Sequence, residues 1–451
     1  MNRDESAAAA RFRDLTETPV PRLILRLSAP TIISMLVTAL YNAADTFFVG
    51  HISTEATAAV GLSFSVMDVI QALGFFCGQG SGNYLSRMLG AGRQREAEQM
   101  AATGLALSLL VGIIAAAAAI LCITPLARFL GASETTLADT VGYLRIILVG
   151  APFMMAQFVL NNQLRYQGSA VYAMAGLLCG AALNTALDPI LIFGCGMGVA
   201  GAALATICSQ LVSFFLLLAG TMKGANIRLR AGNVRLNPHY LKEIVNGGFP
   251  SLFRQGLAAL ATVLMNRAAG AYGDAAIAGM SVTTRVAMFV SSVLIGFGQG
   301  YQPVCAFNYG AGKKARVKEG YFFCLRYGTL FLVLMAACCF AFAPQIIAFF
   351  RDDPQVVAVG APALRWQAVA LPLLACIIIT NMMLQSTGKG VKASVASSAR
   401  SGFCFIPLIL LLPRFFGLAG VEMTQALSDV LSVSISIPLA YSELKAQNVS
   451  F

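Results

Sequence analysis

The chain carries one sequence pattern twice, with a constant spacing of 220 residues between the copies. The repeated elements are Pro30 and Pro250, Gly78-Gln79-Gly80 and Gly298-Gln299-Gly300, Gly90-Ala91-Gly92 and Gly310-Ala311-Gly312, and Pro152 and Pro372. Toward the end of each half the spacing slips by one residue, so that Gly198-Val-Ala-Gly201 corresponds to Gly417-Leu-Ala-Gly420. Four motifs that share one offset indicate a duplicated fold, because chance matches would not keep a common spacing.

Each copy is too apolar to fold as a soluble domain. Of the 451 residues, 57% are hydrophobic and 11% are charged, whereas a soluble domain has about 25% charged residues. Apolar runs of about twenty residues or more recur along the chain, and each is long enough to cross a bilayer. The first run continues to about Gly50, which is too long for the hydrophobic region of a signal peptide. We therefore expect an all-α integral membrane protein.

We predict twelve transmembrane helices, six in each half. They cover residues 22–48, 56–82, 97–124, 136–160, 170–193, 198–221, 240–267, 276–303, 318–342, 356–384, 393–412 and 417–442. Because six is an even number, both halves start on the same side of the membrane, and a pseudo-two-fold axis along the membrane normal relates them. The predicted organisation is a first lobe over 1–222, a cytoplasmic linker over 223–242 and a second lobe over 243–451, with a cleft between the two bundles.

Lysine and arginine residues predict the orientation. If the N-terminus is cytoplasmic, the inner segments hold twenty of the 31 basic residues, and the outer loops hold four. Those four are Arg128, Arg267, Arg351 and Arg414. This excess obeys the positive-inside rule and places both termini in the cytoplasm. The net charge of +11 is thereby explained by topology, and we expect no nucleic-acid partner.

Four polar side chains fall at similar depth in the outer third of the first lobe. At about 1.5 Å per residue, Asp45 on helix 1 and Asp188 on helix 5 each lie roughly 27 Å from the inner boundary. Asn184 lies one turn before Asp188 on the same face, and Thr206 lies roughly 10 Å below the outer end of helix 6. This all-oxygen set suits a proton or a hard cation such as Na⁺, and its spacing does not choose between them. The alternative is that each aspartate only caps or pairs within the bundle.

A second group of residues is predicted to line the cleft. Asp68 lies near mid-membrane on helix 2, where it either faces the cleft or pairs with an arginine. The adaptable side chains of Met35, Met265 and Met288 would suit varied substrates, although methionines also serve as lipid-facing filler. Asn381 on helix 10 completes this group.

Other polar features have simpler interpretations. Glu422 and Asp429 share a face of the last helix, and structural pairing is the interpretation we favour for them. The Gly-x-Gly-x-Gly motif at residues 78–82 follows no strand, so close helix packing explains it better than a nucleotide-binding loop. No Ser/His pair, HExxH motif or metal-ligand spacing occurs, so we expect neither an enzyme nor a cofactor beyond a coupling ion.

Several segments resemble the multidrug and toxic compound extrusion (MATE) family, and most closely its MepA-like branch. They are Pro30-Thr-Ile-Ile-Ser34, Tyr41-Asn-Ala-Ala-Asp45-Thr-Phe-Phe-Val-Gly50, Asn161-Asn-Gln-Leu-Arg-Tyr-Gln-Gly168 and Asn184-Thr-Ala-Leu-Asp188-Pro189. The resemblance covers nearly the whole chain. It implies a monomer with twelve helices in two six-helix lobes in the bacterial cytoplasmic (inner) membrane. It also implies export of small organic cations or amphipathic drugs in exchange for H⁺ or Na⁺.

The resemblance also bears on the cation site. In DinF-type and archaeal members, the first-lobe site uses an Asp on helix 1, an Asn and an Asp on helix 5, and a Thr on helix 6. The matching residues are Asp45, Asn184, Asp188 and Thr206. NorM-type members also use acids on helices 7 and 10, where this chain has Arg254 and Asn381. We therefore expect that second-lobe site to be absent.

The expected function is secondary-active multidrug export by alternating access. A lipid or lipid-linked saccharide flippase is the main alternative, because arginine binds phosphate well. The arginines that keep this alternative open are Arg145, Arg254, Arg285 and Arg365. A passive channel is a further alternative, and it predicts a flux that does not depend on a proton or sodium gradient.

Overall fold

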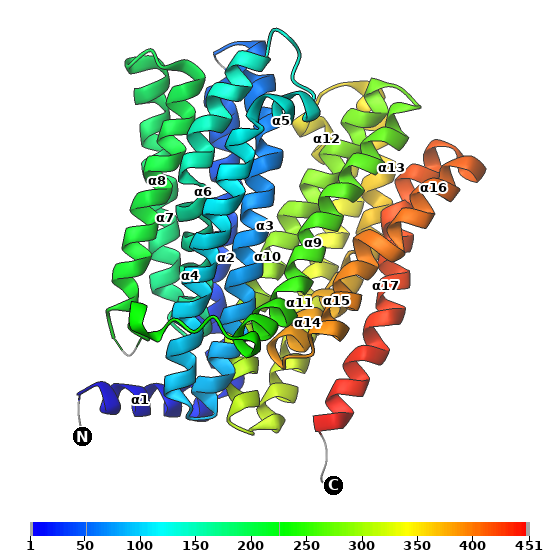
Figure 1. The fold of residues 1–451 in the computed structure, drawn as a ribbon. Helices are drawn as coiled ribbons and strands as arrows, with labels where there is room; N and C mark the ends of the chain where they lie inside the picture. Colours follow the sequence, from blue (N-terminus) through cyan, green and yellow to red (C-terminus); the bar gives the residue numbers. More distant parts are fainter. Residues whose placement is uncertain (1–2, 51, 225, 448–451) are drawn as a thin grey trace. The chain divides into compact units, whose positions relative to one another are not determined.

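The computed structural model describes residues 3–50, 52–224 and 226–447 of the chain. It also leaves the side chains of residues 3–7, 39, 41–47, 50, 54 and 447 outside the description. Within these ranges the chain forms helices and connecting loops, with no strand (Figure 1). The chain divides into two compact units, one formed by Met1–Thr18 and Ile33–Gly248, the other by Pro19–Ile32 and Phe249–Phe451.

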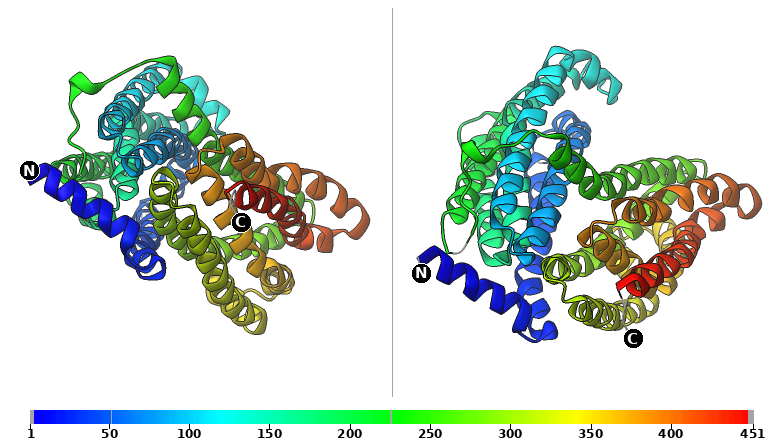
Figure 2. Two further views of the ribbon diagram at one scale, coloured as in Figure 1. Left: turned by 90° about the horizontal axis from the view of Figure 1, so that it is seen from below. Right: turned by 60° about the horizontal axis from the view of Figure 1, so that its bottom comes forward.

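The first unit is a bundle around one central helix, α6. Figures 1 and 2 show its helices in blue to green, and α6 packs against α3, α4 and α8. Its elements are α1 (Arg3–Glu17), the later part of α2 (Val20–Gly50), α3 (Thr54–Gly90), α4 (Gln94–Leu121), α5 (Ile123–Phe129), α6 (Leu137–Tyr166), α7 (Ala170–Pro189), the π-helical turn η1 (Ile190–Gly194), α8 (Gly198–Thr221), the short 3₁₀ turn η2 (Ala231–Asn233) and the first part of α9 (Pro238–Gly270).

The second unit repeats this plan with more breaks in its helices. It holds the rest of α9 together with α10 (Asp274–Gly310), α11 (Lys314–Ala341), α12 (Ala343–Phe350), α13 (Pro354–Ala370), the 3₁₀ turn η3 (Leu371–Leu373), α14 (Leu374–Ser386), α15 (Gly390–Ser398), the π-helical turn η4 (Ala399–Phe403), α16 (Phe405–Phe416) and α17 (Leu418–Gln447). Pro30, Pro152 and Pro250 lie inside continuous helices, whereas Pro372 lies in η3 and interrupts its span.

The predicted all-α, twelve-span fold is confirmed, since each predicted span coincides with one helix or with two helices joined by a short turn. In the described part of the chain, eleven helices are long and apolar enough to cross a membrane. The remaining predicted span, 240–267, lies in α9, whose middle contains Arg254, Gln255 and several glycines. The short helices α1, α5 and α12 were not predicted.

The first helix of each repeat, α2 or α9, belongs partly to one unit and partly to the other. The N-terminal part of α2 belongs to the second unit, where Ser28 Oγ donates to Phe297 O at 2.9 Å and Thr31 Oγ1 donates to Gly296 O at 2.6 Å. Conversely, α9 belongs to the first unit as far as Gly248. The unit boundaries therefore differ from the expected 1–222 and 243–451. The sequence gives no sign of this exchange because apolarity is similar along each helix.

The repeated glycines make these packing arrangements geometrically feasible. A Cβ placed on Gly80 of α3 would lie 2.2 Å from Ile244 O of α9, and one on Gly248 would lie 2.3 Å from Phe76 O. In the second unit, a Cβ on Gly300 of α10 would lie 2.2 Å from Ser28 Oγ. Close helix packing therefore accounts for the Gly-x-Gly motifs, as predicted.

The segment before α9 is fastened to the first unit by hydrogen bonds. Ile227 N donates to Gln167 Oε1 at 2.7 Å, and Arg235 N donates to Thr103 Oγ1 at 2.9 Å. Helix α1 joins this surface through Arg11, whose guanidinium donates to Asn226 Oδ1 at 2.8 Å. Burial lowers the pKa of Arg11 to about 10, which is still high enough for a charged side chain at neutral pH.

Candidate functional site

Helices α7 and α8 pack closely, and this packing brings three of the predicted site residues together. A Cβ on Gly176 of α7 would lie 2.5 Å from the Leu217 side chain, and one on Gly180 would lie 3.0 Å from Ser213 Cβ. Small residues along this seam let the two helices approach one another. Asn184 and Asp188 continue the same face of α7 toward Thr206 on α8.

The three side chains form one buried polar cluster. Asn184, Asp188 and Thr206 are all at most 1% exposed. The amide orientation that satisfies both ends of Asn184 has Nδ2 donating to Asp188 Oδ2 at 3.0 Å and Oδ1 accepting from Thr206 N at 3.3 Å. Thr206 Oγ1 donates to Ala202 O of its own helix at 3.0 Å, which leaves an oxygen lone pair directed away from that bond.

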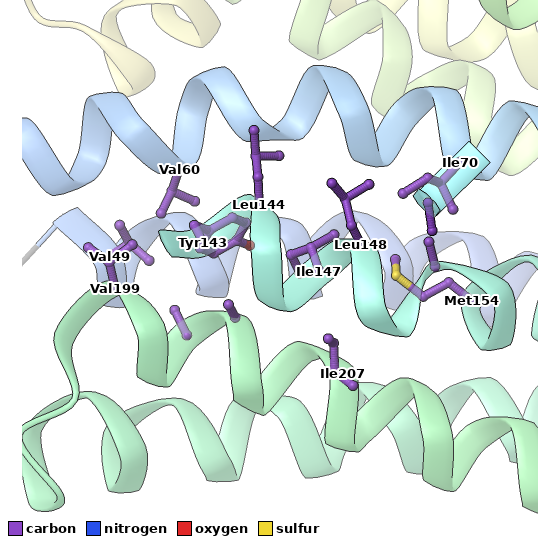
Figure 3. Close-up of a cluster of buried hydrophobic side chains, with 14 of the residues drawn as sticks. Val49, Val60, Ile70, Tyr143, Leu144, Ile147, Leu148, Met154, Val199 and Ile207 are labelled. Atoms are coloured by element: carbon purple, nitrogen blue, oxygen red, sulfur yellow. The ribbon is translucent and has the colours of Figure 1, made fainter. Parts of the chain in front are cut away.

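An apolar core surrounds this cluster. Ile192, Val199 and Ile207, which lie close to Asp188 and Thr206 in sequence, belong to the main hydrophobic cluster of the first unit. Figure 3 shows Val199 and Ile207 along α8, facing Tyr143 and Ile147 of α6. A carboxylate in such surroundings loses most of its solvation by water, so a bound cation or proton stabilises it strongly.

The fourth predicted residue, Asp45, lies in α2, but its side chain is outside the described part of the structure. Val49, one helical turn later, is 1% exposed and belongs to the same hydrophobic cluster as Ile192 and Ile207. Figure 3 shows Val49 beside Val199 of α8. This part of α2 therefore packs in the region of the unit that holds the Asn184–Asp188–Thr206 cluster.

A further oxygen near the cluster was missed at the sequence level. Gln210 lies one turn after Thr206 on α8, so the two side chains share a helix face. Its Oε1 is buried and has no hydrogen-bond partner among the described residues. The spacing of four residues from Thr206 could have identified it, but glutamine in a span carries less charge signal than aspartate.

The five residues predicted to line the cleft have different surroundings. Asp68 is exposed, Met35 is half-buried, and Met288 is 65% exposed, so these three retain accessible surface within their own units. Met265 is 6% exposed and packs in a hydrophobic cluster of the second unit. Asn381 is 5% exposed and donates to Ala393 O at 2.7 Å and to Ser397 Oγ at 2.6 Å. Met265 and Asn381 therefore pack within the second unit, and neither presents a binding surface in this structure.

The segment 161–168 holds helices together. Asn161 Nδ2 donates to Ala173 O at 2.9 Å, which is the first-half counterpart of the bond from Asn381 to Ala393 O. Gln163 Nε2 donates to Ser81 Oγ of α3 at 3.1 Å and to Ala101 O of α4 at 3.0 Å. The duplication is therefore visible in hydrogen bonds as well as in sequence.

In the second unit, Asp429 is paired as predicted. Arg400 Nε lies 2.8 Å from Asp429 Oδ1, and Gln425 Nε2 donates to the same oxygen at 3.0 Å. No hydrogen bond or ion pair links Glu422 to Asp429 or to any other described residue, so the predicted pairing fails for Glu422. Seven residues of helix separate the two acids by about 10 Å along the axis, which is too far for contact.

Three of the four arginines that bear on the flippase alternative are exposed. Arg145 of the first unit and Arg285 and Arg365 of the second are exposed, and Arg254 is half-buried. Arg365 Nε donates to Phe340 O at 3.4 Å, and its guanidinium lies over the Phe340 ring.

A family model for MatE matches residues 30–190 and 250–411, one match in each half of the chain. The chain belongs to the MatE family. The two matched ranges follow the sequence duplication and include both α7, with Asn184 and Asp188, and the equivalent span of the second half. Because MatE proteins are transporters with many apolar helices, the chain is a multi-pass membrane protein.

Relatives and solved structures agree with this membership in the MatE family. The chain is 28% identical over 424 residues to the multidrug export protein MepA of Staphylococcus saprophyticus, covering 93% of each chain. It is also 28% identical to MepA of Staphylococcus aureus (strain MRSA252), covering 94% of each. An outward-facing multidrug resistance MATE transporter superposes with a TM-score of 0.90 at 27% identity over 96% of this chain and 98% of that one. A transporter of the wider MOP superfamily from Pyrococcus furiosus superposes with a TM-score of 0.91 at 26% identity, covering 97% and 98%.

Proposed function

We propose that this protein exports organic cations or amphipathic drugs across a bacterial cytoplasmic membrane in exchange for H⁺ or Na⁺. The observation that carries the proposal is the fully buried Asp188 carboxylate, which lies beside Asn184 and Thr206 in the interior of the first unit. Ionisable groups in such positions usually mark ion pathways in transporters. The export activity named for the MepA relatives agrees with this assignment.

The coupling ion would bind among oxygens. Asp188 supplies the negative charge, Asn184 and Thr206 supply neutral oxygens, and Asp45 of α2 completes the set. Gln210 Oε1 would add a fifth oxygen ligand for the ion, one turn along α8. Carboxylate, amide and hydroxyl oxygens suit Na⁺, and a pair of carboxylates can equally hold one proton. The substrate would be cationic for the same electrostatic reason, since acidic side chains in an apolar bundle attract positive charge.

Coupling would pass through α2. This helix carries Asp45 in its later part, and Pro30 lies two residues before the point where the helix passes from one unit to the other. Proline removes a backbone hydrogen bond and so makes the helix easier to bend there. Cation binding from outside would then favour substrate release outward, and cation release inside would reset the two lobes, 1–222 and 243–451. Both termini would lie in the cytoplasm, and the monomer would be the working unit.

The test is substrate transport in proteoliposomes with the pH and Na⁺ gradients imposed separately. Wild-type protein is expected to move a fluorescent organic cation against its gradient when one of the two ion gradients is present. Asp188→Asn keeps the side-chain size but removes the charge. It is expected to lower the substrate accumulation ratio by about tenfold in a pH gradient of one unit, because the roughly 1.4 kcal/mol that one coupled proton supplies is lost.

The matched control is Asp352→Asn, the same chemical change at an exposed loop position, and it should leave transport unchanged. Gradient-driven transport by Asp188→Asn at the wild-type rate would refute the site. Transport by the wild-type protein without any ion gradient would instead favour a passive channel.

The flippase alternative finds less support. It needs basic groups gathered to hold phosphate, and three of the four intramembrane arginines are exposed rather than held in a buried site. The relatives named above are multidrug exporters. A flippase would move a fluorescent phospholipid between leaflets of the same proteoliposomes, and we expect no such movement.

A further inference from the structure

Helix α17 carries a polar face along nearly its whole length, although it lies within a membrane-spanning bundle. The residues of this face recur every three, four or seven positions, so they lie in one row. They are Glu422, Gln425, Asp429, Ser432, Ser436 and Glu443. All except the half-buried Gln425 are less than 9% exposed. From Glu422 to Glu443 the row extends about 32 Å, which is close to the thickness of the hydrocarbon core.

Asp429 lies at the centre of this row, and its carboxylate is more deeply buried than its counter-ion, Arg400. The Asp429 side chain is 3% exposed, whereas that of Arg400, 2.8 Å away, is 29% exposed. Arg400 belongs to the π-helical turn η4, whose backbone is tied to α17 because Ser428 Oγ donates to Arg400 O at 2.6 Å. Turns of this kind are frequent at functional sites. The guanidinium can therefore leave toward its exposed side while the carboxyl stays buried.

Buried hydroxyl groups on α17 and on a helix packed against it indicate bound water. Ser436 lies on the polar face of α17, is fully buried, and its Oγ has no hydrogen-bond partner among the described residues. Ser386 at the end of α14, a helix that packs against α17, is in the same condition. Buried polar groups without a protein partner are usually hydrogen-bonded to water, and a file of waters beside carboxylates can carry protons.

The place of Asp429 in the duplicated fold supports a role with ions. Gly201 and Gly420, which lie in the first turns of α8 and α17, are related by a spacing of 219 residues. At that spacing Gln425 corresponds to Thr206 and Asp429 corresponds to Gln210. The second unit therefore has a carboxylate at the position equivalent to the edge of the proposed cation cluster, on the equivalent helix.

We propose that Asp429 is a second proton-binding site of this protein, reached along the polar face of α17. When a proton from water binds the Asp429 carboxyl, Arg400 withdraws to its exposed side. When the proton leaves, the ion pair forms again. Glu422 lies near the first turn of α17 and Glu443 near its last turns, so they would receive and deliver the proton at the two ends. The coupling of this proton to export rests on the proposed function, but its binding does not.

The other titratable groups on the elements packed against α17 do not take the place of Arg400 as the counter-ion of Asp429. Arg365 of α13 lies over Phe340, Lys392 of α15 lies 3.8 Å from Glu443, and Arg414 of α16 is exposed near the start of α17. The remaining titratable groups on these elements are thiols, namely Cys376 of α14 and Cys404 beside η4.

The first test needs no transport. Infrared difference spectra of the purified protein, recorded between acid and alkaline pH, are expected to contain a protonated carboxyl band that Asp429→Asn removes. Ser434→Ala, which changes an exposed serine of the same helix, should leave the band in place. A spectrum in which Asp429→Asn removes no such band would overturn the proposal and leave Asp429–Arg400 as a fixed structural pair.

The second test measures coupling. With a pH gradient of one unit, the loss of one coupled proton reduces the substrate accumulation ratio at equilibrium by about tenfold. We expect this reduction in Asp429→Asn and in Arg400→Gln, which keeps the carboxyl but removes its counter-ion. Arg400→Lys is the control for misfolding. Lysine restores the positive charge, so this variant should recover much of the accumulation that Arg400→Gln loses.

The two proposals fail in different ways. If Asp188→Asn abolishes gradient-driven transport while Asp429→Asn leaves the accumulation ratio unchanged, the first-unit site stands and Asp429 is not coupled. If the carboxyl band of Asp429 titrates while Asp188→Asn transports normally, the second-unit proton site stands and the proposed coupling site is wrong.

Discussion

The packing of α9 on α3 depends on Gly80, and replacing it with alanine gives a direct measure of that dependence. The added Cβ would lie 2.2 Å from Ile244 O, and ordinary contact begins at 3.4 Å, so the two helices must separate by about 1.2 Å. The obstacle is a backbone carbonyl, which cannot rotate away. Overpacking of this kind costs about 1–3 kcal/mol, and alanine recovers about 1 kcal/mol through its better helix propensity. The expected net loss of unfolding free energy is therefore up to about 2 kcal/mol.

The assay is reversible unfolding of the purified protein in mixed micelles, with two alanine variants as controls. Gly61 lies on the same helix α3 and Gly256 lies on α9, and a Cβ at either meets nothing within 4 Å. These variants should be as stable as the wild type or more stable by up to about 1 kcal/mol. If Gly80→Ala is as stable as Gly61→Ala, then the first part of α9 does not pack on α3 as described, and the reasoning is wrong.

Three further predictions concern single polar groups. Asn381→Ala should lower the unfolding free energy by about 1–3 kcal/mol, because Ala393 O and Ser397 Oγ lose their donor, and Asn161→Ala should cost a similar amount in the same unfolding assay. Thr31→Val keeps the side-chain shape but loses the hydrogen bond to Gly296 O, so a loss of about 1 kcal/mol is expected, and an unchanged stability would contradict the described position of the N-terminal part of α2. Gln210→Leu removes a buried amide oxygen that has no hydrogen-bond partner in the described part of the chain, so stability without added cation should be unchanged or higher. The same change should weaken the cation dependence of transport, measured as a higher ion concentration for the half-maximal rate.

The sequence predicted the helices well because the membrane imposes a simple rule on them. A span must be apolar for about twenty residues, and the loops between the spans carry glycine, proline or charge. The short helices α5 and α12 escaped prediction because each merely continues an apolar run after a break at Cys122 or Phe342. Division of α2 between the units could not be predicted, since it depends on contacts between distant segments.

For the site, helical spacing and depth were enough to group Asn184, Asp188 and Thr206. Spacing fixes which side chains share a face, and the bilayer fixes depth, so a few ångströms of error still leave these residues together. The placement of Asn381 was harder to predict. Its amide is used for packing against Ala393 and Ser397, and a polar residue in a span looks the same in sequence whether it binds a ligand or a neighbouring helix.

The duplicated fold separates what the scaffold needs from what the chemistry needs. Gly80 and Gly300, like Asn161 and Asn381, keep the same packing role in both halves, because each half must close its own helix contacts. The acids obey no such constraint. Asp188 has a leucine, Leu408, at the equivalent position, and Asp429 corresponds to a neutral glutamine. If the acids served only to pair helices, the symmetric scaffold would favour keeping them in both halves. Their one-sided placement is what two different ion-binding sites in one symmetric frame would produce. In the first site, a carboxylate and neutral oxygens would be completed by a mobile cation. In the second site, a carboxylate is completed by an arginine that a proton would displace.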